Sequence, residues 1–100
     1  MYGPYEPGHW SKATKLQPTF EFLETGRRYR VCGAFTDFDG DVHVPGEEWT
    51  FLGTSFLPYD DGLSLFVSLD GSREWQIRMQ WRPETQGVVL DGLASYLVPA

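Results

Sequence analysis

The segment from Glu47 to Arg82 constrains the fold more than any other part of the chain, because it predicts two consecutive β-hairpins. Large apolar residues fall at strict period two in its last strand: Trp75, Ile77, Met79 and Trp81. Polar residues stand between and beside them: Glu74, Gln76, Arg78, Gln80 and Arg82. This alternation is typical of a sheet with one buried face and one face in water. Turn residues at 58–62 and 70–73 separate three such strands, so an antiparallel meander is expected.

The rest of the chain predicts a mainly β fold with one C-terminal α-helix. Residues 27–36 read as a strand that Gly33 bends, and apolar residues at three- and four-residue spacing predict a helix over 83–97. Residues 1–15 hold Gly-Pro and Pro-Gly pairs without periodicity, so they are expected to be an irregular or disordered tail before a single domain at 16–100. The expected architecture is a small, strongly bent antiparallel meander or an SH3-like, partly open barrel with one terminal helix.

Composition narrows the classes of partner. The formal net charge is -6, which disfavours nucleic acid and anionic membranes and favours a basic partner. The single cysteine, Cys32, permits no intrachain disulfide and is expected to be a small core residue. The chain has no signal-peptide pattern and no apolar window long enough to span a bilayer, so a cytoplasmic location is expected. The oligomeric state does not follow from the sequence.

Four motifs carry a resemblance to a known family. They are G-x-x-Y-x-V from Gly26, F-x-D-x-D-G from Phe35, H-x-x-G-E-x-W-x-F-L-G from His43 and F-L-P-Y-x-D-G-L-S-L-F-V from Phe56. The chain resembles a family of small bacterial domains of unknown function over residues 23–96. The resemblance implies a bacterial, cytosolic, stand-alone domain. It supplies no catalytic or binding residues.

The segment from Asp37 to Glu48 has the outline of a calcium-binding loop, with carboxylates at its first, third, fifth and twelfth positions. Val42 stands where an EF-hand needs glycine, and the flanking segments read as strands, so an EF-hand is not expected. Two interpretations remain. Asp37, Asp39 and Asp41 form a different calcium or magnesium site, or the loop is a solvated turn in which Asp-Gly supplies the geometry.

Aromatic and acidic residues share two predicted loops, at 37–46 and 56–62. These candidate binding residues are Phe38, Phe56, Tyr59, Asp37, Asp39, Asp60 and Asp61. An aromatic groove rimmed by carboxylates suits a Pro-rich or Lys/Arg-containing peptide. The alternative is that the aromatic rings close one end of the fold and the acids keep that end soluble.

No motif for catalysis is present: the chain has no Gly-rich phosphate loop, nucleophile elbow or metalloprotease helix. The sequence therefore predicts a non-enzymatic protein-interaction module without a cofactor. A domain that binds a divalent cation through Asp37–Asp41 is the alternative.

Overall fold

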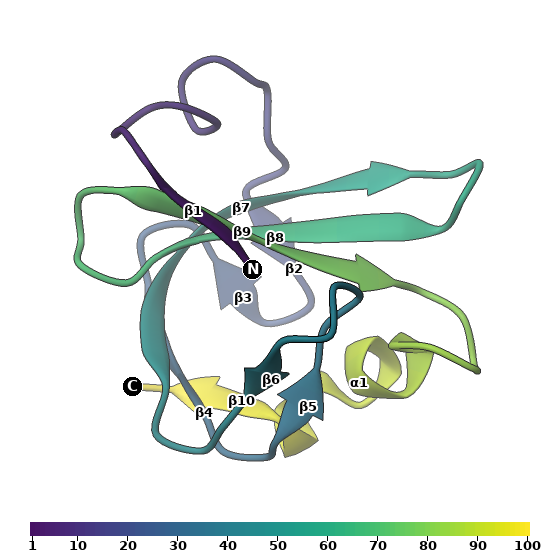
Figure 1. The fold of residues 1–100 in the computed structure, drawn as a ribbon. Helices are drawn as coiled ribbons and strands as arrows, with labels where there is room; N and C mark the ends of the chain where they lie inside the picture. Colours follow the sequence, from purple (N-terminus) through teal and green to yellow (C-terminus); the bar gives the residue numbers. More distant parts are fainter.

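Six antiparallel strands form the main sheet of the computed structural model, which describes residues 1–100. Their order across the sheet is β1–β9–β8–β7–β4–β10 (Figure 1). The strands are β1 (Tyr2–Tyr5), β4 (Arg28–Val31), β7 (Glu48–Leu57), β8 (Gly62–Ser68), β9 (Glu74–Gln80) and β10 (Leu97–Pro99). The predicted meander is confirmed, because β7, β8 and β9 are consecutive neighbours joined by two hairpins.

Period-two patterning places the core on one face of this meander. Ile77 and Met79 are buried at the predicted positions, and they pair with Leu65 and Leu63 of β8. Trp81 is only half-buried, since it follows β9 and its indole Nε1 donates a hydrogen bond to Asp91 at 2.8 Å. The core contains sixteen buried residues and includes the fully buried rings of Trp49, Phe51 and Tyr29.

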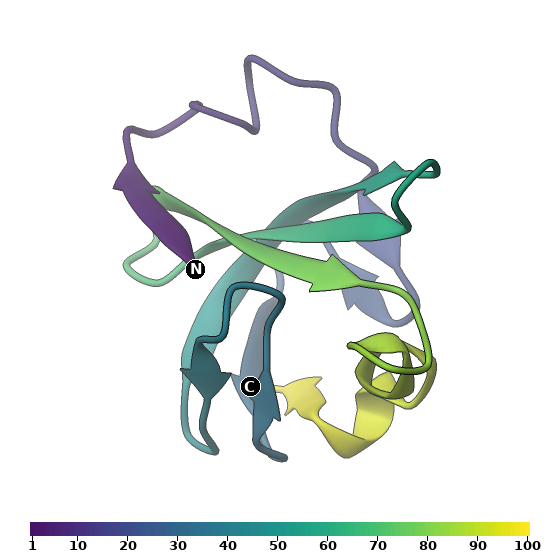
Figure 2. The same cartoon turned by 45° about the vertical axis from the view of Figure 1, so that its right-hand side comes forward.

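The sheet is strongly bent but does not close into a barrel. Register shifts between Phe51 and Gly53, which marks a β-bulge in β7. A Cβ atom at Gly53 would lie 2.7 Å from the Cβ atom of Leu16, so glycine allows residues 16–17 to cross the strand closely. Figure 2 shows β7 curving from its pairing with β4 into the extended β7–β8–β9 arm. Strands β1 and β10 remain unjoined edges, so the structure shows a bent open sheet.

Two short hairpins flank the sheet: β2 (Thr19–Phe20) with β3 (Leu23–Glu24), and β5 (Phe35–Thr36) with β6 (Val42–His43). The strand expected over 27–36 is interrupted at Gly33, where β4 has ended and β5 has not begun. A Cβ atom at Gly33 would lie 2.5 Å from the carbonyl oxygen of Ser95, which explains the bend by close packing of two segments. The adjacent Cys32 is exposed, so its prediction as a core residue was wrong.

The C-terminal helix is much shorter than the predicted span of 83–97. Residues Gly87–Asp91 form α1, Leu93–Ser95 form a 3₁₀ turn, and Leu97–Pro99 form β10. Glycine at 87 and 92 weakens a long helix. Leu97 pairs with Val31 in the sheet, and this strand pairing would be lost if the last residues were helical. No helix in the structure has the length and apolar character needed to cross a membrane.

Residues 2–5, which were expected to lie in an irregular or disordered tail, form a strand. Strand β1 pairs with β9, and the following loop (residues 6–14, the N-terminal loop) lies against the sheet through Trp10, whose ring centroid is 5.2 Å from that of Phe66. Glu74 fixes this loop. Its carboxylate accepts hydrogen bonds from the amides of Gly8, Trp10 and Ser11 and from the Ser11 hydroxyl.

Glu74 is therefore buried rather than part of the wetted face of β9. Burial alone favours the neutral acid and raises its pKa, but the hydrogen bonds from Ser11, Trp10 and Gly8 outweigh burial and lower the pKa of Glu74. A period-two pattern cannot predict that Glu74 is buried, because the groups that donate hydrogen bonds to it come from a loop more than sixty residues away along the chain.

Candidate functional site

The loop between β5 and β6 is built around a buried carboxylate. Asp37 Oδ1 accepts hydrogen bonds from the backbone amides of Asp39 and Asp41, both at 3.0 Å, which closes the Asp-Gly turn. Asp37 Oδ2 lies 2.8 Å from His43 Nε2. The Asp37 side chain has no exposed surface. This residue therefore shapes the loop from within, and its side chain is not exposed on the surface.

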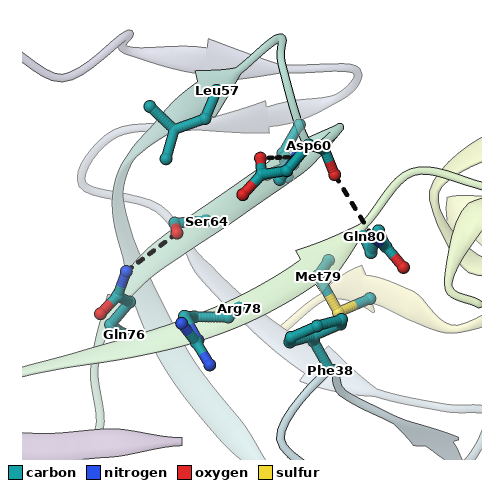
Figure 3. Close-up of a pocket in the computed structure, with 10 residues that line it drawn as sticks. Phe38, Leu57, Asp60, Ser64, Gln76, Arg78, Met79 and Gln80 are labelled. Carbon is teal, nitrogen blue, oxygen red and sulfur yellow. Dashed lines mark hydrogen bonds between the residues drawn. The ribbon is translucent and has the colours of Figure 1, made fainter.

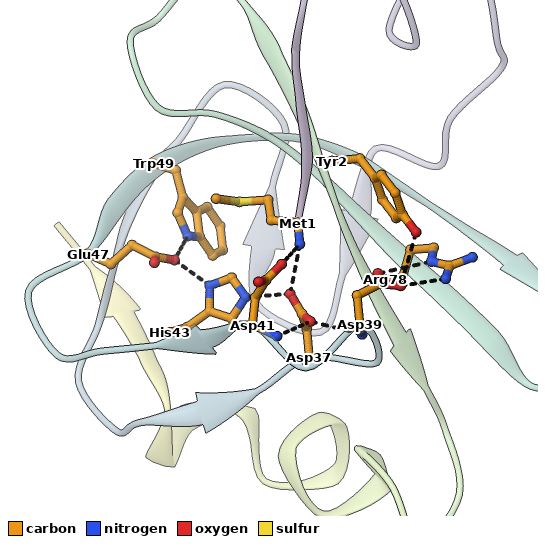
Figure 4. A network of polar contacts seen from close by, with 9 residues as sticks. All are labelled: Met1, Tyr2, Asp37, Asp39, Asp41, His43, Glu47, Trp49 and Arg78. Carbon is orange, nitrogen blue, oxygen red and sulfur yellow. Dashed lines mark hydrogen bonds and ion pairs between the residues drawn. The ribbon is translucent and has the colours of Figure 1, made fainter.

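His43 extends this polar network to the main sheet (Figure 4). Its Nδ1 lies 2.7 Å from Glu47 Oε2, which also accepts a hydrogen bond from Trp49 Nε1 at 3.1 Å. Burial alone lowers the pKa of His43, but its hydrogen bonds to Glu47 and Asp37 and their negative charges prevail and raise the pKa. The imidazolium form donates to both carboxylates, so His43 ties the loop to the start of β7.

The three aspartates of the predicted metal loop point to different partners. Asp39 forms a bidentate pair with Arg78, Asp41 contacts the Met1 amino group, and Asp37 faces His43. The structure contains no group of three His, Cys, Asp or Glu side chains placed to hold a metal ion. The Asp37–Asp41 segment is folded here as a hydrogen-bonded turn.

Arg78 of β9 holds the tip of this loop against the sheet. Its guanidinium carbon lies 5.1 Å from the ring centroid of Tyr2 and 5.4 Å from that of Phe38, distances typical of cation–π contacts. The hydrogen bond from Arg78 lowers the pKa of Asp39 below its usual value. The Phe38 amide also donates to the Arg78 carbonyl oxygen at 2.8 Å. The backbone of Phe38 is therefore held in place, and its side chain is 49% exposed.

A cavity of about 160 Å³ opens between this loop tip and the β7–β8 hairpin (Figure 3). We call it the Phe38 groove. Its lining residues are Phe38, Leu57, Asp60, Gly62, Leu63, Ser64, Gln76, Arg78, Met79 and Gln80. The groove lies beside β9, on the face that the sequence predicted to be wetted, and the neighbouring part of that face is covered by the N-terminal loop. This groove, on a partly covered face of the sheet, is the candidate site for recognition.

The structure brings together only some of the predicted binding residues. Phe38 and Asp60, which belong to different loops, line the same groove, and Asp39 pairs with Arg78 of the lining. Asp61 lies outside it and pairs with Arg82 at 2.9 Å. Tyr59 extends from the hairpin tip with 83% of its surface exposed. These two residues share the turn with Asp60 but do not line the groove.

Phe56 lies on the opposite face of the hairpin from the groove. Its ring meets Trp81 edge to face at a centroid distance of 6.2 Å. The adjacent Leu57 projects to the other face, because successive side chains of a strand alternate, and it lines the groove. The sequence pattern identified the aromatic residues of the hairpin but did not assign them to faces, since the bulge in β7 shifts the alternation.

Sequence reasoning missed eight of the ten residues that line the groove, among them Leu57, Gln76, Arg78 and Gln80. The last three alternate along β9, and such polar residues ordinarily only face water. No sequence signal distinguishes this stretch from a solvated face, because its neighbour Phe38 arrives from a loop some forty residues earlier.

A second cavity, of about 220 Å³, lies between the β2–β3 turn and α1. It is more open than the Phe38 groove, and Glu21, Phe22 and the segment 90–95 line it. Its carboxylate from Asp91 already accepts the hydrogen bond from Trp81. The Phe38 groove therefore offers the better-defined combination of apolar and charged groups.

Comparisons with known proteins agree with the motifs. A family model described as a domain of unknown function (DUF3601) matches residues 10–97. Among solved structures, the chain is similar to an integron cassette protein, VCH_CASS4, from the mobile metagenome of Vibrio cholerae. The two are 38% identical, with a TM-score of 0.81, over 85% of this chain and 93% of that chain. No curated protein matches the chain. By the span of the family match, the chain belongs to the DUF3601 family of domains of unknown function, as the resemblance predicted.

Proposed function

We propose that this protein is a non-enzymatic interaction module that binds a segment of a protein partner in the Phe38 groove. One observation carries the proposal. Phe38 and Asp60 lie in loops of different hairpins, and the fold places both in the lining of one cavity together with Leu57. Phe38 and Leu57 are each about half exposed. Half-exposed apolar side chains beside a charged group are the composition of a recognition surface.

The size of the groove favours a side chain of a partner over a free small molecule. Cavities that hold drug-sized ligands or cofactors usually measure about 300–1,000 Å³. The Phe38 groove, at about 160 Å³, is roughly half the lower limit of that range. A protein segment gains most of its affinity from contacts around such a cavity, so one inserted side chain suffices there.

The chemistry of the lining supports binding over catalysis. Arg78 is engaged by Asp39, and the Ser64 hydroxyl accepts a hydrogen bond from Gln76 at 2.9 Å. Nucleophilic catalysis needs a nucleophile with a base within hydrogen-bond reach, and the Ser64 hydroxyl has only the Gln76 amide beside it. The partner we propose is basic or Pro-rich, in keeping with the aromatic wall and the net charge of -6. A reducing, cytoplasmic setting belongs to the proposal, because Cys32 is a free and exposed thiol.

A peptide selection tests this function. Random peptides displayed on phage are selected on the immobilised protein, and each enriched peptide is measured against the Phe38→Ala and Tyr59→Ala variants. We expect Phe38→Ala to weaken binding about tenfold or more, as loss of an aromatic anchor does. Tyr59→Ala is the matched control, because Tyr59 is more exposed, lies at the tip of the hairpin and is outside the groove. Circular dichroism confirms that both variants are folded.

The selection also has a result that contradicts the proposal. If no peptide is enriched, or if enriched peptides bind Phe38→Ala as tightly as the natural sequence, the groove is not the recognition site. Peptides that lose affinity only for Tyr59→Ala would move the site to the hairpin tip.

A further inference from the structure

We infer that the Phe38 groove captures a cationic side chain of the partner, an arginine or a lysine, with its charged group on the Asp60 carboxylate and its alkyl stem between Phe38 and Leu57. This inference rests on the proposed function and deepens it by naming the chemistry of the occupant. Charge, hydrogen-bonding capacity and shape each point to a cation.

The charge of the groove is unbalanced. Its lining contains two ionisable side chains, Asp60 and Arg78. The guanidinium of Arg78 is neutralised by its bidentate pair with Asp39, through Nε–Oδ2 at 3.1 Å and Nη2–Oδ1 at 2.5 Å. Asp60 forms no ion pair, and its only side-chain hydrogen bond is the one that Oδ1 accepts from the Gly62 amide at 2.9 Å. One negative charge is therefore left for an occupant to neutralise.

The lining leaves several acceptors for an occupant. Asp60 Oδ2 has no donor. The amide nitrogen of Gln76 donates to Ser64 Oγ at 2.9 Å, and that of Gln80 donates to the Asp60 carbonyl oxygen at 3.3 Å. These bonds use one of the two N–H donors of each amide, and both Oε1 atoms remain as acceptors. A guanidinium has five N–H donors and no acceptor, and an ammonium has three donors, so both complement this set.

The walls suit the alkyl stem of such a side chain. Arg and Lys bury three or four methylene groups against apolar surface while their heads stay hydrated. Phe38 offers a ring and Leu57 offers branched methyl groups, and each is about half exposed. The Phe38 ring already stacks on one guanidinium, that of Arg78, at 5.4 Å. A second cation near the other face or edge of the ring would gain dispersion contacts and the field of Asp60.

A bare metal cation does not fit the same groove. Calcium takes six to eight oxygen ligands, usually with several carboxylates, and magnesium demands near-octahedral geometry. Asp60 is the only acidic residue in the lining. A single carboxylate with two amide oxygens falls short of either set, whereas it can hold one monovalent organic cation.

The test compares three short peptides that differ at one side chain. The probes are acetyl-Pro-Pro-Arg-Pro-Pro-amide and the same sequence with citrulline or glutamate in place of arginine. Citrulline keeps the shape of arginine without its charge. Amide NMR spectra of the labelled protein follow each titration. We expect the arginine peptide to shift the amides of Gly62, Ser64 and Gln76 and to bind about tenfold more tightly than the citrulline peptide, as a charge-assisted contact predicts.

Two isosteric variants assign the charge to one carboxylate. Asp60→Asn keeps the oxygen that caps the Gly62 amide, so the turn is retained. It should remove the preference for arginine over citrulline. Asp61→Asn removes the same charge from the next residue, where asparagine tolerates the positive φ of 54°. Because Asp61 pairs with Arg82 outside the groove, this variant should keep the preference.

The outcomes separate this inference from the proposed function. Equal binding of the arginine and citrulline peptides, with shifts at the groove, overturns the capture of a cation and leaves peptide binding intact. Tighter binding of the glutamate peptide overturns it in favour of an anion held by Arg78. If the arginine peptide causes no shifts while phage-selected peptides bind in a Phe38-dependent manner, the cationic occupant is wrong and the groove still serves as the binding site.

Discussion

At the scale of single residues, His43 links pH to stability. Hydrogen bonds and charges from Glu47 and Asp37 raise its pKa in the folded protein above the ordinary value of 6.5. A raised pKa means that the folded state holds the proton more tightly than the unfolded chain does. The resulting stabilisation is complete below the unfolded pKa and is lost as the pH rises through the folded pKa. We expect the free energy of unfolding to fall over this range.

Urea unfolding at a series of pH values between about 6 and 9 measures this loss, and NMR titration of the imidazole identifies the residue. His9 is the control, because it stacks on Tyr5 and faces no carboxylate within ion-pair distance. His9→Gln should keep the decline. A free energy of unfolding that stays level across the titration of His43 would contradict the prediction.

Asp37 and His43 also show a limit of sequence reading at this scale. The spacing of Asp37, Asp39 and Asp41 is compatible with a cation-binding loop and with a hydrogen-bonded turn. Which of them forms depends on where the oxygens point. That is decided by His43 from the next strand and by Arg78 from β9, and neither contact has a local signature.

At the scale of elements, the N-terminal loop depends on one carboxylate. Glu74 accepts four hydrogen bonds from residues 8–11. In Glu74→Gln, an NH₂ group replaces one of the two accepting oxygens and meets donors, so bonds are lost. We expect a loss of about 1–3 kcal/mol in the free energy of unfolding, as for unsatisfied buried donors. Faster hydrogen exchange at the amides of Gly8, Trp10 and Ser11 should accompany it.

Glu84→Gln is the matched control, because Glu84 is exposed and forms no ion pair. It should leave both measurements unchanged. Acid should loosen the same loop in the natural sequence, because the pKa of Glu74 is lowered in the folded protein. The stabilisation from Glu74 is therefore present above the ordinary pKa of 4.5 and is lost as the pH falls through the folded pKa. Unchanged exchange in Glu74→Gln would show that Trp10 packing alone holds the loop.

Prediction of elements succeeded where the pattern is local. The meander of β7, β8 and β9 followed from period two and turn residues, since each hairpin pairs segments that are close in sequence. The predicted C-terminal helix was too long, because the apolar spacing of residues 93–97 fits a helix as well as it fits a turn followed by a strand. Pairing of β10 with β4, more than sixty residues away, decided between them.

At the scale of the whole molecule, the net charge of -6 attracts a cationic partner as it approaches. Raising the salt from about 10 mM to about 1 M shortens the Debye length from about 30 Å to about 3 Å. The association rate of the acetyl-Pro-Pro-Arg-Pro-Pro-amide probe should therefore fall several-fold, while that of its citrulline counterpart should change little. Relaxation-dispersion NMR measures both rates. The same salt dependence for both peptides would mean that the field of the protein does not steer the arginine.

The β class, the bent meander, the acidic and aromatic character of two loops, and the family could all be predicted from the amino-acid sequence, because these depend on residue type and short spacing. Three outcomes required the three-dimensional contacts: Asp37 is buried, Tyr2–Tyr5 join the sheet, and Phe38 and Asp60 share a groove with Leu57. The reason is physical. Each of these outcomes depends on contacts between segments distant in sequence, and their free energy depends on the complete arrangement of the chain and not on any one stretch of it.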